Sequence, residues 1–322
     1  MIQTVLVVGS GMMGSAIGVC AAAAGNHVIY YDNSADFPQK IKQRTDELLS
    51  ELLSYELISA SDLDPIKARL DTSADLRTAA SNADLIIEAI YENLEAKQKL
   101  FKELDGLADP SIPILSNTSG LRITDISSHM QHPERSLAAH FWLPAHLIPL
   151  VEIVIGDKSS PELAERIKEI LIGWGKSPVI VKKDLPGQLA NRILQAVIRE
   201  AVNIVEIGLA SPEDVDKAVQ MGMALRFPVW GPLEHVDAVG FDICKSVQDT
   251  VLPEISDRKQ ASPLFAEMMA TGCSGVKSGE GFYDWSKKDI NALVKRRNDF
   301  IVFAIKQINQ SHLSTERELK KE

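Results

Sequence analysis

Three glycines near the start of the chain have the spacing of a phosphate-binding turn. They lie in the segment GSGMMG, as Gly9, Gly11 and Gly14, directly after a run rich in β-branched residues. Such a turn lets the backbone approach a pyrophosphate, and the first N–H groups of the following helix, at Met12 and Met13, attract its negative charge. The pattern predicts a dinucleotide site; the alternative is a glycine-rich turn that binds no cofactor.

An acidic residue further along indicates which dinucleotide binds. Asp32 follows Gly14 by eighteen residues, where the second predicted strand ends. Its carboxylate can accept hydrogen bonds from the hydroxyls of an adenosine ribose, whereas the 2′-phosphate of NADP would meet a like charge. We therefore expect NAD as the cofactor.

A histidine and a glutamate twelve residues apart could together remove a proton. His140 closes one predicted strand and Glu152 opens the next. Oxidation of an alcohol needs a base, and imidazole titrates near neutral pH, while a carboxylate partner fixes its tautomer. His146 competes for the role, and an isolated histidine is more often structural than catalytic. The histidines have no metal-binding spacing, so we expect no metal.

A short run of hydroxyl and amide residues, SNTSG, follows another predicted strand at residues 116–120. Ligands of open α/β sheets bind beyond the carboxyl ends of the strands, so Asn117 and Ser119 are expected at the cofactor crevice. The alternative is helix capping or turn formation, which is a common role of these residue types.

Alternating apolar runs and helical patterns position these residues. We predict strands at 5–8, 27–31, 83–89, 112–116, 136–140, 151–155 and 178–181. Two helices within 36–68 interrupt the alternation. Beyond Lys182 the patterns are helical, at 189–209, 212–220, 233–249, 262–271 and 289–309, followed by a frayed charged tail. An α/β domain at 1–184 and a helical domain at 185–322 follow.

The composition excludes several classes of protein. The 322 residues carry 34 Lys and Arg against 44 Asp and Glu, so no global positive field attracts nucleic acid or an anionic membrane. The apolar stretches are too short to cross a bilayer, and we expect no signal peptide. Three widely spaced cysteines indicate neither a disulfide framework nor a zinc site. We expect a cytoplasmic protein that acts on a small molecule.

Seven blocks match one family in order along almost the whole chain. They are VLVVGSGMMG, ADLIIEAIYENLEAK, LSNTSGLRITDI, residues 140–152, DLPGQLANRILQAVIREA, WGPLEHVDAVGFD and SGEGFYDW. The chain resembles the NAD-dependent L-3-hydroxyacyl-CoA dehydrogenases. The resemblance implies a Rossmann-like doubly wound sheet with a helical hairpin insert, followed by an all-α C-terminal domain for substrate and homodimer contacts. It also implies that Glu92 and Lys97 lie near the nicotinamide.

The resemblance gives roles to four other residues. His140 looks like the family's catalytic base and Glu152 like its carboxylate partner. Ser119 and Asn191 look like the polar residues that position the substrate oxygen. The implied activity, a reaction of fatty acid metabolism, interconverts an L-3-hydroxyacyl-CoA and the 3-ketoacyl-CoA with hydride passing to nicotinamide.

The chain departs from the family's usual pattern in two places. Where the family usually has HFFNP, this chain has Leu143 in place of the Asn. The stretch GMALRFPVWGPLE looks more like a branch that oxidises free hydroxy acids, such as L-gulonate dehydrogenase and the hydroxymethyl-pyridine-carboxylate dehydrogenases. There Arg226 could pair bidentately with a substrate carboxylate, and its alternative is an ordinary surface arginine.

Three functions therefore stay open. The first is a 3-hydroxyacyl-CoA dehydrogenase, and the alternative is a dehydrogenase of a free 3-hydroxy acid or a hydroxymethyl aromatic acid. The third is a non-catalytic NADH-binding protein, as in lambda-crystallin. The helical insert carries interleaved basic and acidic residues, which is weak support for CoA and typical of a solvated helix face.

Overall fold

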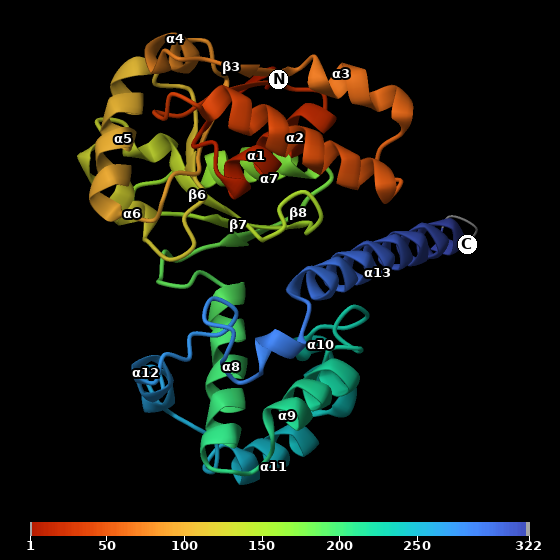
Figure 1. The fold of residues 1–322 in the computed structure, drawn as a ribbon. Coiled ribbons are helices and arrows are strands. Elements are labelled where there is room, and N and C mark those ends of the chain that lie inside the picture. Colours follow the sequence, from red (N-terminus) through yellow and green to blue (C-terminus); the bar gives the residue numbers. More distant parts are fainter. Residues whose placement is uncertain (1, 320–322) are drawn as a thin grey trace. The chain divides into compact units, whose positions relative to one another are not determined.

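The computed structural model describes residues 2–319 and contains two compact units, Met1–Asn191 and Arg192–Glu322 (Figure 1). The first unit is built on an eight-stranded sheet in the order β3-β2-β1-β4-β5-β6-β7-β8. Its strands are β1 (Thr4–Val8), β2 (His27–Tyr31), β3 (Leu70–Thr72), β4 (Leu85–Glu88), β5 (Ile114–Ser116), β6 (Ser136–Phe141), β7 (Leu150–Val154) and β8 (Ser177–Val181). The short strand β3 is absent from the sequence prediction, because its sequence, LDT, has one half-buried and two exposed residues and so no apolar run.

The direction of the strands changes once within the sheet. Strands β1 to β6 run parallel, whereas β7 runs antiparallel to β6 and parallel to β8. This hairpin places His140 directly opposite Glu152 in the register of the two strands. The predicted α/β, Rossmann-like class is confirmed, and the antiparallel step brings the two residues together.

Helices lie between the strands of the first unit and pack on the sheet. They are α1 (Met12–Ala23), α2 (Phe37–Ser54), α3 (Leu63–Lys67), α4 (Leu76–Ser81), α5 (Leu94–Leu107), α6 (Ile123–Ile126) and α7 (Pro161–Gly173), with short 3₁₀ turns at Ala60–Asp62, Ser127–His129 and Pro133–Arg135. Together, α2 and α3 form the predicted helical insert between β2 and β3. Capping explains several of these boundaries: α7, for example, begins with a proline after Ser160, whose side chain accepts the N–H of Leu163.

The core of this unit has two faces because alternate residues of a strand point to opposite sides. Leu6 and Val8 of β1 contact a cluster that includes Phe101 and Leu104 of α5. Val5 and Val7 are equally buried but lie on the other face, where α1 packs. Burial on both faces explains why these strands are continuous apolar runs in the sequence.

The second unit is helical. Its elements are α8 (Ala190–Glu206), which begins within the first unit, α9 (Pro212–Ala218), the π-helical turn Val219–Met223, α10 (Pro232–Val239), α11 (Phe241–Val251), α12 (Pro263–Ala270), the 3₁₀ turn Trp285–Lys287 and α13 (Ile290–Leu319). A single helix over 233–249 was the wrong prediction: Gly240, at φ 102°, separates α10 from α11. The prediction that the last helix ends at residue 309 in a frayed tail was also wrong, because α13 continues to Leu319.

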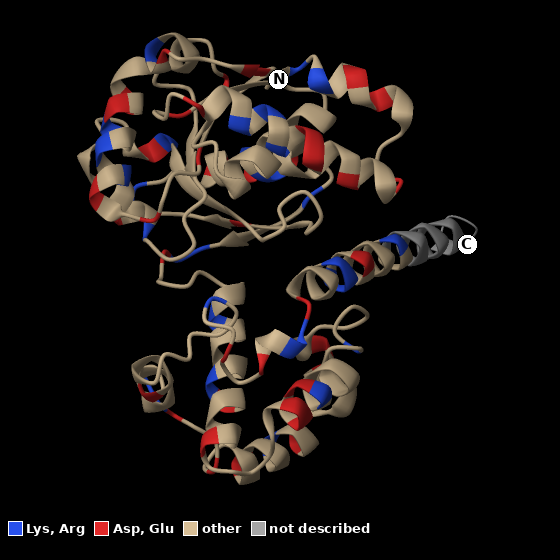
Figure 2. Ribbon diagram, viewed as in Figure 1, with Lys and Arg blue, Asp and Glu red and all other residues tan. Residues whose placement is uncertain are grey.

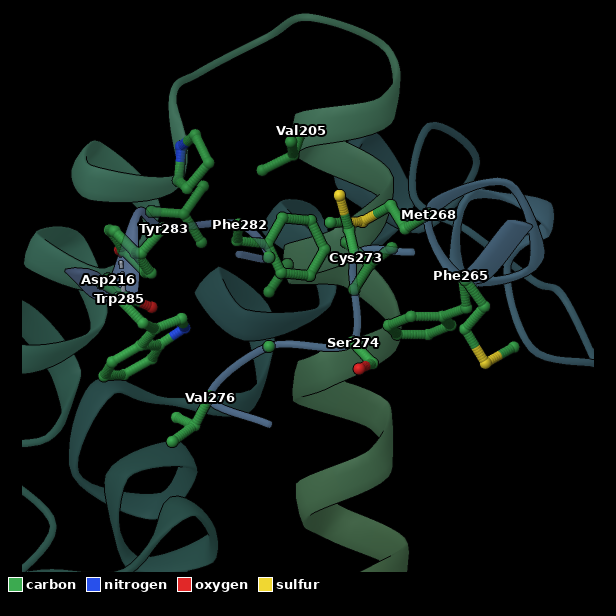
Figure 3. Close-up of a pocket in the computed structure, with 17 residues that line it drawn as sticks. Val205, Asp216, Phe265, Met268, Cys273, Ser274, Val276, Phe282, Tyr283 and Trp285 are labelled. Atoms are coloured by element: carbon green, nitrogen blue, oxygen red, sulfur yellow. Dashed lines mark hydrogen bonds between the residues drawn. The ribbon is translucent and has the colours of Figure 1, made fainter. Parts of the chain in front are cut away.

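A cavity of about 700 Å³ lies in the second unit among α8, α9, α12 and the segment 273–285 (Figure 3). Its lining is mostly apolar, with Phe265, Met268 and Phe282 among the side chains drawn. The carboxylate of Asp216 accepts a hydrogen bond from the hydroxyl of Tyr283 at 2.7 Å. Helices α8, α9 and α12 therefore enclose a hollow, mostly apolar space.

Acidic and basic residues alternate over the surface of both units, and neither sign gathers into one extended face in this view (Figure 2). Helices α2 and α9, for example, each carry both signs. In the described part of the chain, no helix is both long and apolar enough to cross a membrane.

Candidate active site

The glycine turn has the geometry that a phosphate site needs. Gly9 adopts φ 108°, a conformation that glycine reaches without strain, and a Cβ on Gly14 would lie 1.9 Å from the carbonyl oxygen of Gly9. A Cβ on Gly11 would meet no protein atom within 4 Å, so the backbone there faces open space. Met12, the first residue of α1, is exposed, and Met13 is half-buried. The turn therefore has room for a pyrophosphate at the start of a twelve-residue helix.

Asp32 lies beside this turn, at the end of β2. Its Oδ2 accepts hydrogen bonds from the N–H and hydroxyl of Ser10, and its Oδ1 accepts from the N–H and hydroxyl of Ser34. Burial alone would raise the pKa of Asp32, but these hydrogen bonds hold it below its usual value. The carboxylate is thus ionised and fixed beside the glycine turn.

His140 and Glu152 form a buried pair at the β6–β7 step. His140 Nδ1 lies 2.8 Å from Glu152 Oε2, and neither side chain is more than 8% exposed. The indole Nε1 of Trp142 donates to the same oxygen, while Oε1 accepts the backbone N–H groups of Leu189 and Ala190. Four donors therefore surround one carboxylate.

This environment determines the protonation state of the pair. Burial would raise the pKa of Glu152, but the hydrogen bonds from His140, Ala190, Trp142 and Leu189 together lower it to about 2. An ionised carboxylate only accepts hydrogen bonds, so Nδ1 of His140 carries the proton. In the neutral imidazole, Nε2 is then the nitrogen with a free lone pair, which is the arrangement of a general base.

His146, the competing histidine, lies elsewhere. Its Nε2 contacts Glu51 Oε2 of α2 at 2.9 Å, and its side chain is 5% exposed. Burial lowers the pKa of His146, and Glu51 acts in the opposite direction. These contacts join the loop after β6 to the helical insert, which is a structural role.

The loop after β5 is held from several sides. The side-chain oxygen of Asn117 accepts the N–H of Phe141, and the amide of Gln188 donates to the carbonyl of Thr118. The side chain of Asn191 donates to the carbonyl of Ser119 at 3.4 Å. The structure thus brings Asn117, Ser119 and Asn191 together with the strand that carries the histidine.

A buried charge network supports the same loop. Lys97 Nζ lies 2.5 Å from Glu88 Oε1, with side chains 1% and 0% exposed, and 3.4 Å from Glu92 Oε2. Glu92 Oε1 accepts the hydroxyl of Thr118 and the N–H groups of Ser119 and Gly120. Burial would raise the pKa of Glu92, but these donors and Lys97 lower it. Glu92 is therefore an ionised anchor of the loop, whereas Lys97 lies in the interior.

Arg226 lies in the second unit, between the π-helical turn and α10, and is exposed. Three residues of the first unit were not predicted: Glu88, Trp142 and Gln188. A signal existed for Glu88, because a carboxylate closes the apolar run ADLIIE, and for Trp142, because residues two apart share a strand face. No sequence signal indicated Gln188.

Two family models together match most of the chain. Residues 4–185 match "3-hydroxyacyl-CoA dehydrogenase, NAD binding domain", and residues 187–285 match "3-hydroxyacyl-CoA dehydrogenase, C-terminal domain". Among curated proteins, the chain is 33% identical over 299 residues to 5-formyl-3-hydroxy-2-methylpyridine 4-carboxylate 5-dehydrogenase of Mesorhizobium japonicum, covering 92% of this chain and 95% of that protein. It is 35% identical over 288 residues to a probable 3-hydroxybutyryl-CoA dehydrogenase of Bacillus subtilis, covering 89% and 99%.

Solved structures agree in fold. A crystal structure of the 5-formyl-3-hydroxy-2-methylpyridine 4-carboxylic acid 5-dehydrogenase, described as an NAD⁺-dependent dismutase, superposes with a TM-score of 0.87 at 31% identity, covering 96% of this chain and 99% of that chain. The (S)-3-hydroxybutyryl-CoA dehydrogenase from Ralstonia eutropha gives 0.75 at 33% identity, covering 89% and 100%.

Proposed function

Because the chain belongs to the 3-hydroxyacyl-CoA dehydrogenase family, we propose that His140 and Glu152 remove the hydroxyl proton of its substrate. The chain is an NAD-dependent oxidoreductase that acts on CH–OH groups. When bound, NAD supplies the acceptor for the hydride. The observation that carries the assignment to these two residues is the 2.8 Å contact between His140 Nδ1 and a buried carboxylate, which leaves Nε2 as the base.

The remaining site residues act on the substrate through hydrogen bonds. Nε2 of His140 takes the hydroxyl proton, and the carboxylate of Glu152 stabilises the imidazolium that forms. The hydroxyl of Ser119 and the amide of Asn191 hydrogen-bond the reacting oxygen as it becomes a carbonyl. The link between these two residues, at the carbonyl of Ser119, supports their joint role.

The residues around the glycine turn fit the cofactor. Open space at Gly11, the N-terminus of α1 and the ionised carboxylate of Asp32 suit a pyrophosphate and an adenosine ribose. We assign Met12 and Met13 to the pyrophosphate. Residues proposed near the nicotinamide are Asn117 and Glu92, with Lys97 acting from the interior through Glu92.

Two substrate classes are candidates. The family name and most relatives point to an L-3-hydroxyacyl-CoA, whereas the Mesorhizobium relative acts on a free pyridine carboxylic acid. The charge of the helical insert favours the free acid. Of the five cations there that could bind CoA phosphates, all but the exposed Lys42 already have partners: Lys40 pairs with Asp36, Lys67 pairs with Asp46, Arg44 donates to the carbonyl of Ser10, and Arg69 donates to the carbonyl of Ala22. Arg226 is the candidate ligand for the carboxylate of such an acid.

A direct assay separates the two classes. Acetoacetyl-CoA with NADH, and a panel of free 3-hydroxy acids and hydroxymethyl aromatic acids with NAD, are compared by kcat/KM. We expect the free acids to have the higher values, because the insert offers CoA few unpaired cations. Efficient reduction of acetoacetyl-CoA would reverse this order in favour of the acyl-CoA. Binding of NADH without turnover of any compound would indicate a non-catalytic protein.

We also propose that the second unit forms a homodimer contact. Within its described residues 192–308, Val202 and Val302 are the only buried apolar side chains. Exposed apolar residues are numerous on α10, α11 and the segment before them, including Val229, Leu233 and Phe241, which are 73–87% exposed. Sedimentation equilibrium should give twice the chain mass of 35.3 kDa, and a monomer at micromolar concentration would contradict the proposal.

The two matched family models support a division of labour between the two parts of the chain. We propose that residues 1–184 bind NAD and carry the base, and that residues 185–322 contribute to substrate binding and dimerisation. Three cysteines without a disulfide, Cys20, Cys244 and Cys273, support a reducing cytoplasmic location.

A further inference from the structure

Trp142 donates a hydrogen bond to the carboxylate of Glu152 in addition to the contact that orients His140. The indole Nε1 of Trp142 donates to Glu152 Oε2 at 2.8 Å, and His140 Nδ1 lies at the same distance from the same oxygen. The other oxygen, Oε1, accepts the two backbone N–H groups at residues 189 and 190. Trp142 is therefore coupled directly to the atom that pairs with the proposed base.

Strand geometry explains how Trp142 reaches this atom. Strand β6 ends at Phe141, and residues two apart in an extended chain point to the same face, so Trp142 follows His140 toward Glu152. The two rings are 5.9 Å apart and inclined at 57°. Glu152 is fully buried, and a hydrogen bond to a charged acceptor is stronger where water is excluded.

We propose that Trp142 is a positioning residue that makes His140 a weaker base. By donating its N–H to Glu152 Oε2, the indole reduces the negative charge that this oxygen presents to the imidazole. The inference rests on the proposed function, in which neutral His140 accepts the hydroxyl proton. A carboxylate stabilises an imidazolium through its negative charge, and a second donor on the same oxygen reduces that stabilisation. Trp142 thus keeps His140 unprotonated, and able to accept a proton, at a lower pH than Glu152 alone would allow.

The other groups that hydrogen-bond to Glu152 are uncharged. Within the described residues, His140 and Glu152 are the titratable side chains of this hydrogen-bond network. The neighbouring elements contribute uncharged side chains or backbone N–H groups, from Asn117, Val179, Leu189 and Ala190. The charged network of Glu88, Lys97 and Glu92 joins the adjoining loop at its backbone N–H groups. Removing the indole of Trp142 therefore takes one hydrogen-bond donor away from the carboxylate of Glu152 and leaves the formal charges of the site as they are.

Two substitutions test the proposal, Trp142→Phe and Trp142→Leu. Both remove the indole N–H, and phenylalanine stands at this position in the family's HFFNP block. The acid limb of the pH profile of kcat/KM for oxidation should move up by about half to one pH unit, with kcat retained at alkaline pH. The titration midpoint of His140 should rise by the same amount in the absence of substrate. It is followed by NMR on histidine-labelled protein, with the His140 signal assigned from a His140→Asn variant.

The controls separate this effect from packing and from the proposed function. Trp174→Phe, at the end of α7 in the same unit, should leave both midpoints unchanged. Wild-type chain carrying 5-fluorotryptophan, whose N–H is the stronger donor, should lower the midpoint of His140 and needs no substitution. Unchanged midpoints of His140 in all three proteins would overturn the proposal, whatever happens to kcat. If His140→Ala retained turnover, the proposed function would fail, and the NMR titration would still decide whether Trp142 acts on His140.

Discussion

Replacing His140 by alanine is expected to lower turnover about a hundredfold or more, the usual contribution of a general base. The variant loses the imidazole whose Nδ1 contacts Glu152 and whose Nε2 is the proposed proton acceptor. The affinity for NADH should change little, because the glycine turn and Asp32 follow β1 and β2, whereas the side chain of His140 hydrogen-bonds to Glu152 of β7. Steady-state kcat with the substrate found in the assay, and a fluorescence titration with NADH, measure the two effects.

His146 provides the matched control for this prediction. It is also a buried histidine with a carboxylate partner, Glu51, but that pair joins a loop to the helical insert. His146→Ala should therefore keep a turnover close to that of the wild type, although it removes a contact of α2. Near-normal turnover in His140→Ala, or an equal loss in His146→Ala, would contradict the assignment of the base.

Sequence periodicity predicted the elements that carry the site, because buried parallel strands are continuous apolar runs and α1 begins directly at a glycine turn. It could not predict the antiparallel direction of β7. Both directions bury the same apolar residues of LVEIV, so the pattern is the same, and only the structure shows that His140 and Glu152 face each other in register.

Side-chain partners were harder to predict than elements. The carboxylate of Glu88 ends an apolar strand, and its role depends on an ion pair with Lys97 of the next helix, nine residues away. The indole of Trp142 looks like packing in the sequence, and its role depends on which oxygen of Glu152 it reaches. The break at Gly240 was missed because a single glycine inside a helical pattern is often tolerated. For Glu88 and Trp142 the missing information is a side-chain contact, and for Gly240 it is a backbone conformation.

Replacing Lys97 by methionine is expected to lower the free energy of unfolding by about 3–5 kcal/mol, because it leaves a buried carboxylate without its cation. Glu88 is fully buried and would keep only the hydroxyl of Ser116 and the N–H of Ile90 as donors. Burial already raises the pKa of Glu88, with Lys97 opposing it, so removal of Lys97 raises that pKa further. In the folded variant, the carboxyl of Glu88 then binds a proton more tightly than it does in the unfolded chain. Urea unfolding should show a small loss of stability below about pH 4.5 and the full loss near neutral pH.

A second substitution separates the charge of Glu88 from the lost volume of Lys97. In the double variant Glu88→Gln with Lys97→Met, the buried group is a neutral amide, and most of the stability at neutral pH should return while its pH dependence disappears. Lys102→Met, an exposed position on the same helix, should change the free energy of unfolding by no more than about 0.5 kcal/mol. If the double variant were as unstable as Lys97→Met alone, the loss would come from packing around the lysine stem. Recovery would instead show that the loss in Lys97→Met comes from the buried charge of Glu88, left without the cation that lies 2.5 Å from it.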